Sequence, residues 1–151
     1  MREVRIRPAT AGDAERLTAL MLASSAYRGV YASILAGYRL TPEYVEGHPT
    51  FVAEAGGRVV GFYGLVVEPA ELDLLFVSDD AQGLGVGRAL VAHLLAEARR
   101  RGIASVRVVS HPQAEGFYRR MGARPVGVVP PSPPRVTWER PELVFDVPGT
   151  D

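Results

Sequence analysis

The spacing of apolar residues divides the chain into alternating strand-like and helix-like stretches. Apolar residues that alternate with polar ones, or that form short β-branched runs, are typical of strands. Apolar residues three or four positions apart are typical of a helix with one buried face. On these criteria strands are expected at 4–7, 50–55, 59–67, 71–77, 105–109, 126–129, 136–138 and 143–147, and helices at 14–27, 86–101 and 112–121, with a further short helix within 28–49.

Local signals support several of these boundaries. The segment Thr10-Ala11-Gly12-Asp13 is expected to form a capping box at the start of the first helix. The pair Gly56-Gly57 between two β-rich runs predicts a hairpin. The chain of 151 residues is long enough for one domain with its own core, and no repeat divides it. We therefore expect a single α/β domain over residues 1–151, with a mixed central sheet and helices on both faces.

Composition removes several kinds of chemistry. The formal net charge is zero, so neither nucleic acid nor an anionic membrane is an expected partner. The absence of cysteine excludes disulfides and thiolate nucleophiles, and the absence of lysine excludes Schiff-base catalysis. The three histidines lack metal-ligand spacing, so no metal is expected. With no run long enough to span a membrane and no signal-peptide pattern, the sequence predicts a cytoplasmic protein.

One stretch has the local order of an anion-binding site. The apolar strand at 71–77 leads through an acidic turn into a glycine-rich segment and then a long helix. Free N–H groups at a helix start bind phosphates, and glycines let the backbone approach them closely. The candidate ligand-binding residues here are Gln82, Gly83, Leu84, Gly85, Val86, Gly87 and Arg88.

The spacing within this segment excludes two familiar phosphate motifs. A dinucleotide fingerprint that begins at Gly83 requires a glycine where Arg88 stands. A nucleoside-triphosphate P-loop requires a lysine, and all seventeen basic residues of this chain are arginine. The remaining pattern is Q-x-x-G-x-G, formed by Gln82, Gly85 and Gly87.

This pattern resembles the pyrophosphate-binding motif Q/R-x-x-G-x-G/A of the GCN5-related N-acetyltransferase (GNAT) superfamily. The opening IRPATAGDAERL and the order of the expected elements are also similar to that superfamily. The resemblance implies acetyl-CoA as acyl donor and direct transfer to a primary amine of a small molecule or peptide. It also implies a monomer or homodimer.

The resemblance assigns roles to further residues. In the superfamily the strand before the glycine turn splays from its neighbour, so the backbone at Phe76 and Val77 is expected to contact the pantetheine arm and the developing oxyanion. A second motif, N-x-x-A-x-x-F-Y-x-x-x-G, is matched with His111 in place of the asparagine, followed by Phe117 and Tyr118. The resemblance places the Tyr118 hydroxyl near the coenzyme sulfur, where it can protonate the thiolate. The alternative is a core aromatic, which its helical spacing alone would predict.

Glu71 is the candidate general base. It lies eleven positions before Gln82, which matches the catalytic glutamate of the histone-acetylating branch. Regular alternation is expected to put Glu71, Asp73, Leu75 and Val77 on one face of the strand. The alternatives are a solvated turn acid at Glu71, and Asp73 as the base instead.

Three functions remain open from the sequence. The first is an N-acetyltransferase, and the second is a non-catalytic acyl-CoA-binding module that would not need Glu71 or Tyr118. The third is a nucleotide-binding regulatory domain, which would be stabilised more by ATP or NAD than by coenzyme A. The tyrosines between 27 and 44, together with Tyr63, are candidates for an acceptor pocket.

Overall fold

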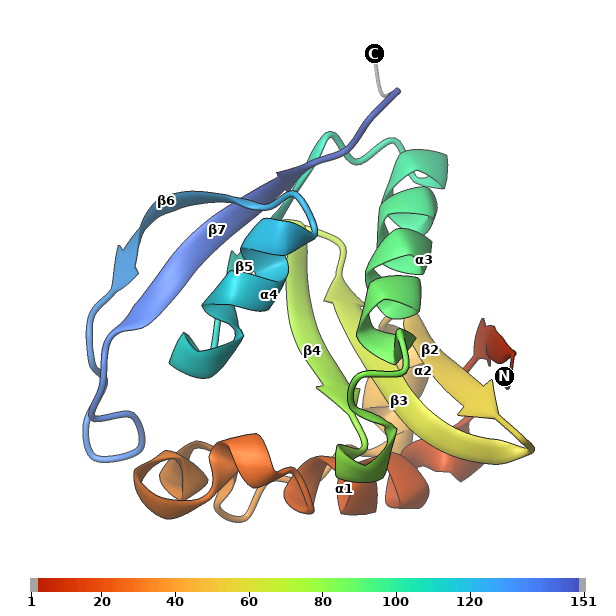
Figure 1. Cartoon of the computed structure of the whole chain (residues 1–151), viewed down its shortest axis with the longest axis horizontal. Coiled ribbons are helices and arrows are strands. Elements are labelled where there is room, and N and C mark those ends of the chain that lie inside the picture. The colour runs from red at the N-terminus through yellow and green to blue at the C-terminus, as the bar shows by residue number, and fades with distance from the viewer. Residues whose placement is uncertain (1–2, 150–151) are drawn as a thin grey trace.

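The computed structural model describes residues 3–149, and its centre is a seven-stranded sheet in the order β1-β2-β3-β4-β5-β7-β6 (Figure 1). Neighbouring strands are antiparallel except for the parallel pair β4 and β5. The sheet is therefore mixed, as the sequence predicts. The strands are β1 Val4–Pro8, β2 Thr50–Ala55, β3 Arg58–Val66, β4 Glu71–Val77, β5 Ser105–Val109, β6 Arg124–Val129 and β7 Arg140–Asp146.

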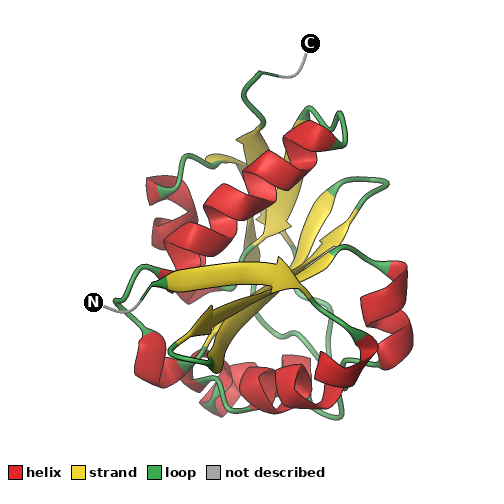
Figure 2. Cartoon of the chain, turned by 90° about the vertical axis from the view of Figure 1, so that its right-hand side faces the viewer, coloured by secondary structure: helices red, strands yellow, loops and turns green. Residues whose placement is uncertain are grey.

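Helices cover both faces of the sheet (Figure 2). One face packs against α3, whose buried side chains include Leu90 and Leu94, together with Tyr118 of α4. The other face packs against α1 through Leu17 and Met21. The helices are α1 Ala14–Leu22, α2 Pro42–Gly47, α3 Val86–Arg100 and α4 Glu115–Arg120, with 3₁₀ segments at Ala11–Asp13, Ser25–Tyr27, Gly29–Leu35, Asp79–Ala81 and Pro112–Ala114.

The first helix is shorter than the sequence predicts. It ends at Leu22, and the chain continues as 3₁₀ segments up to Leu35. The reason is tertiary, because Asp79 accepts hydrogen bonds from the Ser25 N–H and hydroxyl, at 3.2 and 3.1 Å. The backbone groups after Leu22 are therefore held by the turn before α3 instead of continuing the helix.

The end of the chain also differs from the expected strands. Val136 forms only an isolated bridge with Ser132, so residues 136–138 are not a strand. Prolines at 130, 131, 133 and 134 remove backbone donors from this connection. The last strand instead begins at Arg140, where it pairs with both β5 and β6.

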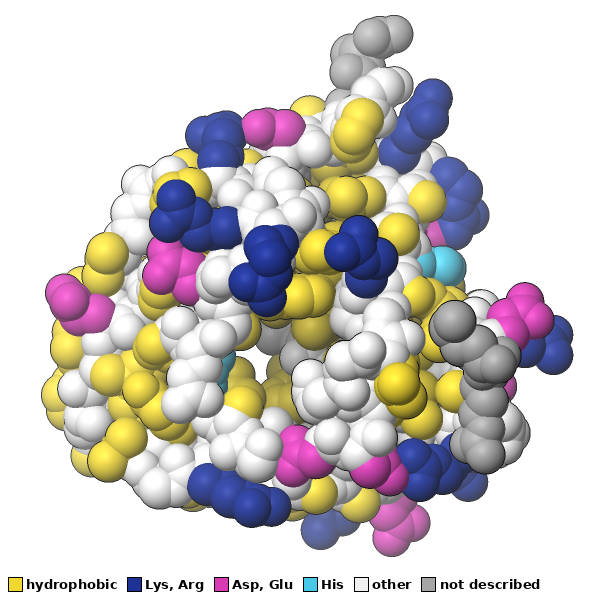
Figure 3. Space-filling model, viewed as in Figure 1, with side chains coloured by type: hydrophobic (Ala, Val, Ile, Leu, Met, Phe, Trp, Pro, Cys, Tyr) yellow, Lys and Arg dark blue, Asp and Glu magenta, His cyan; other side chains and the backbone are white. Residues whose placement is uncertain are grey.

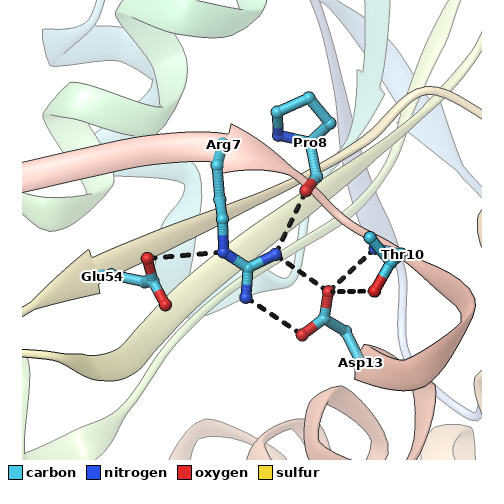
Figure 4. Close-up of polar contacts among 5 residues, drawn as sticks. All are labelled: Arg7, Pro8, Thr10, Asp13 and Glu54. Atoms are coloured by element: carbon cyan, nitrogen blue, oxygen red, sulfur yellow. Dashed lines mark hydrogen bonds and ion pairs between the residues drawn. The ribbon is translucent and has the colours of Figure 1, made fainter.

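The capping residue Asp13 anchors the start of α1 to β1 (Figure 4). Its carboxylate accepts two hydrogen bonds from Arg7, at 2.9 and 3.0 Å, and one from the Thr10 N–H at 2.8 Å. Arg7 also forms an ion pair with Glu54 of β2. The pKa of Asp13 is lowered to about 2, mainly by the hydrogen bond from the Arg7 guanidinium.

Replacing Asp13 with asparagine should therefore destabilise the fold in a pH-dependent manner. A lowered carboxyl pKa contributes stability above the unfolded-state pKa near 3.8, and this contribution is lost as pH falls through about 2. We expect the variant to lose about 2 kcal/mol of unfolding free energy at pH 7, and the difference from wild type to disappear near pH 2. Urea titrations at pH 7, 4 and 2 measure it. The exposed carboxylate of Asp146, which is paired with Arg124, provides the control, since Asp146→Asn should change stability much less. A deficit for Asp13→Asn that stays constant with pH would contradict the assignment.

Candidate functional site

The site is built around the divergence of β4 from β5. These strands pair only at Glu71 with Arg107 and at Leu72 with Val108, and beyond that point they separate (Figure 1). The splaying that the family resemblance implied is therefore present. A cleft of about 880 Å³ occupies the gap, lined by both strands, the glycine turn, α4 and the segment around Tyr27.

Beyond Leu72, the edge of β4 that faces the cleft has no partner strand. The Ser78 N–H donates to the Val60 carbonyl of β3 at 2.8 Å. Successive residues of a strand point their backbone N–H and C=O groups to opposite sides. The backbone groups of Phe76 therefore also point to β3, whereas those of Leu75 and Val77 point to the cleft. Gln82 confirms this direction, because its side-chain amide donates to the Val77 carbonyl at 3.1 Å. The structure thus adds the backbone of Leu75 to the candidate binding groups, although the sequence did not single this residue out. The Phe76 ring lies in the core and is 6% exposed.

The glycine turn leaves open space at the start of α3. Gly83 and Gly85 have φ values of +80° and +82°, and a Cβ at either position would meet no atom within 4 Å. Gly87 has a different role, because a Cβ there would lie 3.0 Å from the ring of Phe117. Gly87 therefore permits α3 and α4 to approach closely. Leu84 is 67% exposed and does not line the cleft.

Unpaired cations lie along the cleft beside this turn. Arg88 and Arg120 both line it, both are exposed, and neither forms an ion pair with any residue in the described part of the chain. Figure 3 shows the hollow in this face, with apolar side chains inside it and basic side chains on its rim. Free N–H groups, open space and unpaired guanidinium groups together suit a phosphate-bearing ligand.

Tyr118 lies on the cleft wall. Its side chain is 7% exposed, and its ring packs edge-on against Phe117 and Phe145. The hydroxyl makes no hydrogen bond with any residue from 3 to 149. Burial, with a smaller contribution from Tyr27, raises the pKa of Tyr118 far above its usual value. The group is thus a protonated donor across the neutral range.

A β-bulge in β4 overturns the expected alternation of its side chains. Leu72 pairs with Leu65 and Leu74 pairs with Gly64, so Asp73 is an extra residue in the ladder. A bulge of this kind shifts the residues on its two sides out of simple alternation.

The prediction of which side chains share a face of β4 is therefore wrong for the residues before the bulge. Leu72 packs in the α3-side core together with Leu75 and Val77, whereas Leu74 and Phe76 pack in the α1-side core. The side chains that precede the bulge are therefore on the opposite face from the one that regular alternation predicts.

Glu71 lies on the α1 side of the sheet, opposite the face that α3 and α4 cover. Its partner Arg107 is flanked by Val106 and Val108, which both point into the α3-side core, so the Arg107 and Glu71 side chains extend from the other face. The Arg107 guanidinium donates to Glu71 Oε1 at 2.9 Å and to Glu142 at 2.5 Å. Glu71 lines the cleft, and its Oε2 makes no hydrogen bond with the described residues.

Asp73 lies nearby but is held by a different partner. The Tyr44 hydroxyl of α2 donates to its carboxylate at 2.7 Å. Burial and this hydrogen bond raise the pKa of Tyr44. Asp73 is exposed and lines the cleft, so both candidate bases are on its wall.

His111 has one nitrogen engaged and one enclosed. Its Nδ1 accepts a hydrogen bond from the Gln113 N–H at 3.0 Å, which caps the short turn before α4. Its Nε2 is buried and has no hydrogen-bond partner among the described residues, although the Ala26 backbone lies close enough to affect its titration. Burial lowers the pKa of His111, so the imidazole is neutral near pH 7. The expected coenzyme contact of this residue stays a prediction.

Aromatic residues line the cleft near the connection between β6 and β7 and form its aromatic end. The ring of Tyr27 lies 4.5 Å from that of His111, and Tyr31 lies 4.5 Å from His111 and 4.8 Å from Trp138. Tyr27, Tyr38 and Trp138 line the cleft. Burial raises the pKa of Tyr27 to about 12.

Two contacts hold this aromatic end in place. The Ser33 hydroxyl donates to the Arg135 carbonyl, and the Arg135 guanidinium donates to the Ala36 carbonyl at 3.2 Å. The connection between β6 and β7 is therefore tied to the 3₁₀ segment Gly29–Leu35. Tyr63, a further acceptor-pocket candidate, is instead buried on the α3 side and bonded to His93 at 2.7 Å.

The part of the chain that the structure describes meets neither the requirements of a metal site nor those of a membrane helix. Within residues 3–149, no group of three or more His, Asp or Glu side chains is arranged to hold a metal ion. None of the helices in the same range has the length and apolarity to cross a membrane.

The fold and the cleft define the class of the protein. The acetyltransferase (GNAT) domain family matches residues 23–129, so the chain belongs to this family. Solved GNAT structures share the fold. One from Rhodopseudomonas palustris superimposes with a TM-score of 0.81 at 23% identity over 94% of both chains. The yncA acetyltransferase from Salmonella typhimurium, solved with acetyl-CoA, gives 0.75 at 19% identity over 96% of this chain and 94% of that one.

Curated relatives are similar over part of the chain. A chloroplastic serotonin N-acetyltransferase 2 from Oryza sativa subsp. japonica is 34% identical over 50% of this chain and 34% of its own length. The peptidyl-lysine N-acetyltransferase YjaB from Salmonella typhimurium is 34% identical over 58% and 59%. Blasticidin-S acetyltransferase from Streptomyces morookaense is 40% identical over 62% and 71%. The chain thus spans about a third of the length of the serotonin N-acetyltransferase and about three fifths of the length of YjaB.

Proposed function

We propose that the protein is an acetyl-CoA-dependent N-acetyltransferase that transfers the acetyl group directly to a primary amine. The observation that carries the proposal is the opening between β4 and β5, which joins the glycine turn to the Tyr118 hydroxyl in one cleft. Family membership supports the same activity. The named relatives act on serotonin, peptidyl-lysine and blasticidin-S, so both small-molecule and peptide acceptors fit this class.

Several groups of this chain fit the coenzyme. The N–H groups at the start of α3, the space above Gly85 and the guanidinium groups of Arg88 and Arg120 would hold its phosphates. At the edge of β4, the backbone groups of Leu75 and the N–H of Val77 would pair with the amide groups of the pantetheine arm. When bound, acetyl-CoA would supply an activated acetyl group as a thioester.

The chain supplies a proton donor and a proton acceptor on opposite faces of the sheet. Tyr118 is on the α3 side and would give its proton to the departing sulfur. Glu71 is on the α1 side and would remove a proton from the amine, directly or through one water. A backbone N–H of the free β4 edge would stabilise negative charge on the carbonyl oxygen. This arrangement lets acetyl-CoA and the amine enter the cleft from different sides of the sheet.

Coenzyme binding provides the test of this proposal. In a thermal-shift panel, acetyl-CoA and coenzyme A should raise the unfolding midpoint more than ATP or NAD. Gly85→Val should raise the dissociation constant of acetyl-CoA at least ~10-fold, equivalent to ~1.4 kcal/mol, because the side chain would occupy the space of the phosphates. Calorimetric titration measures the constant, and release of free thiol over a set of amines measures transfer.

Gly102→Val is the matched control. Gly102 has a similar φ of +73° and open space around its Cβ, but it follows the far end of α3. Both substitutions cause the same kind of backbone strain, so only the loss of coenzyme affinity should separate them. Unchanged affinity in folded Gly85→Val would overturn the phosphate assignment. Coenzyme binding without thiol release for any amine would instead indicate a non-catalytic acyl-CoA-binding module.

A further inference from the structure

Arg140 differs from the other arginines because it is partly buried and unpaired. Among residues 3–149, only three arginines are not exposed. Arg7 is paired with Asp13, and Arg107 is paired with two glutamates. The side chain of Arg140 makes no hydrogen bond or ion pair with any residue in that range. Enclosing a guanidinium N–H without a hydrogen-bond acceptor is costly, and Arg140 Nε is enclosed in this way, so a partner for it is expected from outside the chain.

The position of Arg140 puts it at the aromatic end of the cleft. Arg140 begins β7, and the next residue, Pro141, accepts a hydrogen bond from the Ser110 N–H at 2.8 Å, just before His111. Its charge lies close enough to the Tyr27 hydroxyl to oppose part of the rise in the pKa of Tyr27. Arg140 lines the cleft, and its Nε is enclosed while its terminal nitrogens stay accessible.

Two other nitrogens beside Arg140 also lack partners. Trp138 Nε1 and His111 Nε2 are buried and make no hydrogen bond with the described residues. Together with Arg140 Nε, they are all the side-chain nitrogens of residues 3–149 in this condition, and all three belong to the cleft lining. The indole N–H and the guanidinium are donors only. They therefore require acceptor oxygens, which the protein does not provide here.

We infer that the acceptor amine carries a carboxylate that Arg140 binds, with its carbon skeleton against the rings of Tyr27 and Trp138. This inference rests on the proposed acetyltransferase function. A planar guanidinium matches a carboxylate with two parallel hydrogen bonds. A neutral carbonyl would leave the charge of Arg140 uncompensated. A dianion suits the site less well, since Glu71 and Glu142 are nearby and Arg107 is already shared between them.

Matched pairs of amines test the inference. The substrates are the common amino acids and their C-terminal amides, with short peptides that have a free or an amidated C-terminus. Rates are expressed per neutral amine, because amidation itself lowers the pKa of the amine. We expect wild type to favour carboxylates by about 10- to 100-fold in kcat/KM, as a charged hydrogen bond implies. The free amino acids and the peptides distinguish a small-molecule acceptor from a peptide end.

The variants separate a carboxylate contact from general damage. Arg140→Gln should reduce the preference to within about 3-fold while leaving the KM for acetyl-CoA unchanged. Arg124→Gln is the control, since this exposed arginine of β6 is paired with Asp146 and does not line the cleft, and its preference should match wild type. Equal rates for acid and amide in wild type would overturn the inference, as would an Arg140→Gln defect confined to acetyl-CoA.

A binding measurement keeps the inference independent of turnover. The same acid and amide pairs are titrated by calorimetry into protein saturated with coenzyme A, which cannot react. Carboxylates that bind wild type and Arg124→Gln but not Arg140→Gln support the inference even if no amine is acetylated. The absence of carboxylate binding to wild type contradicts it, while transfer to amines without a carboxylate would leave the proposed activity intact.

Discussion

Replacing Tyr118 with phenylalanine should lower kcat about 100-fold and leave the affinity for acetyl-CoA nearly unchanged. The substitution keeps the ring against Phe117 and Phe145 and removes only a hydroxyl that has no hydrogen-bond partner among residues 3–149. Fold stability should therefore change little. Steady-state kinetics with thiol detection and calorimetric titration of acetyl-CoA measure the two quantities.

The pH dependence adds a second criterion for Tyr118. Because burial raises the pKa of Tyr118, its proton is present throughout the neutral and moderately alkaline range. The loss of kcat in Tyr118→Phe should thus be the same from pH 6 to 9. Tyr63→Phe is the control, since that buried tyrosine is bonded to His93 on the α3 side and does not line the cleft. It should lose stability and keep turnover. A Tyr118→Phe variant with normal turnover and a lower unfolding midpoint would show a packing role only.

Replacing Glu71 with glutamine should lower the plateau of log(kcat/KM) against pH by about 100-fold. An amine is mostly protonated at neutral pH and cannot attack until a proton is removed. If Glu71 removes it, the wild-type profile rises with pH and levels off. The variant should lose the part of this rise that belongs to the enzyme and follow the pKa of the amine alone.

Glu142→Gln is a close control for Glu71→Gln. Both carboxylates are bonded to Arg107, and their side chains are 28% and 27% exposed, but only Glu71 lines the cleft. Each substitution leaves Arg107 with one carboxylate, so the structural cost should be similar. Parallel profiles for wild type and Glu71→Gln would remove Glu71 from the mechanism. The same measurement on Asp73→Asn would then follow.

The sequence alone was sufficient for the local elements of the proposed coenzyme site. The order of strand, glycine turn and helix at 71–101 depends on apolar periodicity and on glycines that adopt positive φ, and both are properties of short segments. The structure places α3 at Val86–Arg100, immediately after this turn. The mixed sheet and the assignment to the family could likewise be made from pattern and motif.

Contacts between distant segments decided the rest. The face on which Glu71 lies depends on a bulge at Asp73, which is set by pairing between β3 and β4 and not by the period of β4 itself. The end of α1 depends on Asp79, more than fifty residues further along the chain.

The aromatic end of the cleft shows the same limit of sequence reasoning. The sequence indicated an aromatic region around Tyr27, because aromatic residues cluster there in the chain. Trp138 and Arg140 gave no such signal. Whether an arginine is paired depends on which carboxylates the fold brings near it, and the sequence does not show this. The sequence by itself determined the strand, glycine turn and helix that we propose to bind an acyl coenzyme. The tertiary structure alone decided which charges remain uncompensated in the cleft, because burial and pairing are properties of the folded chain.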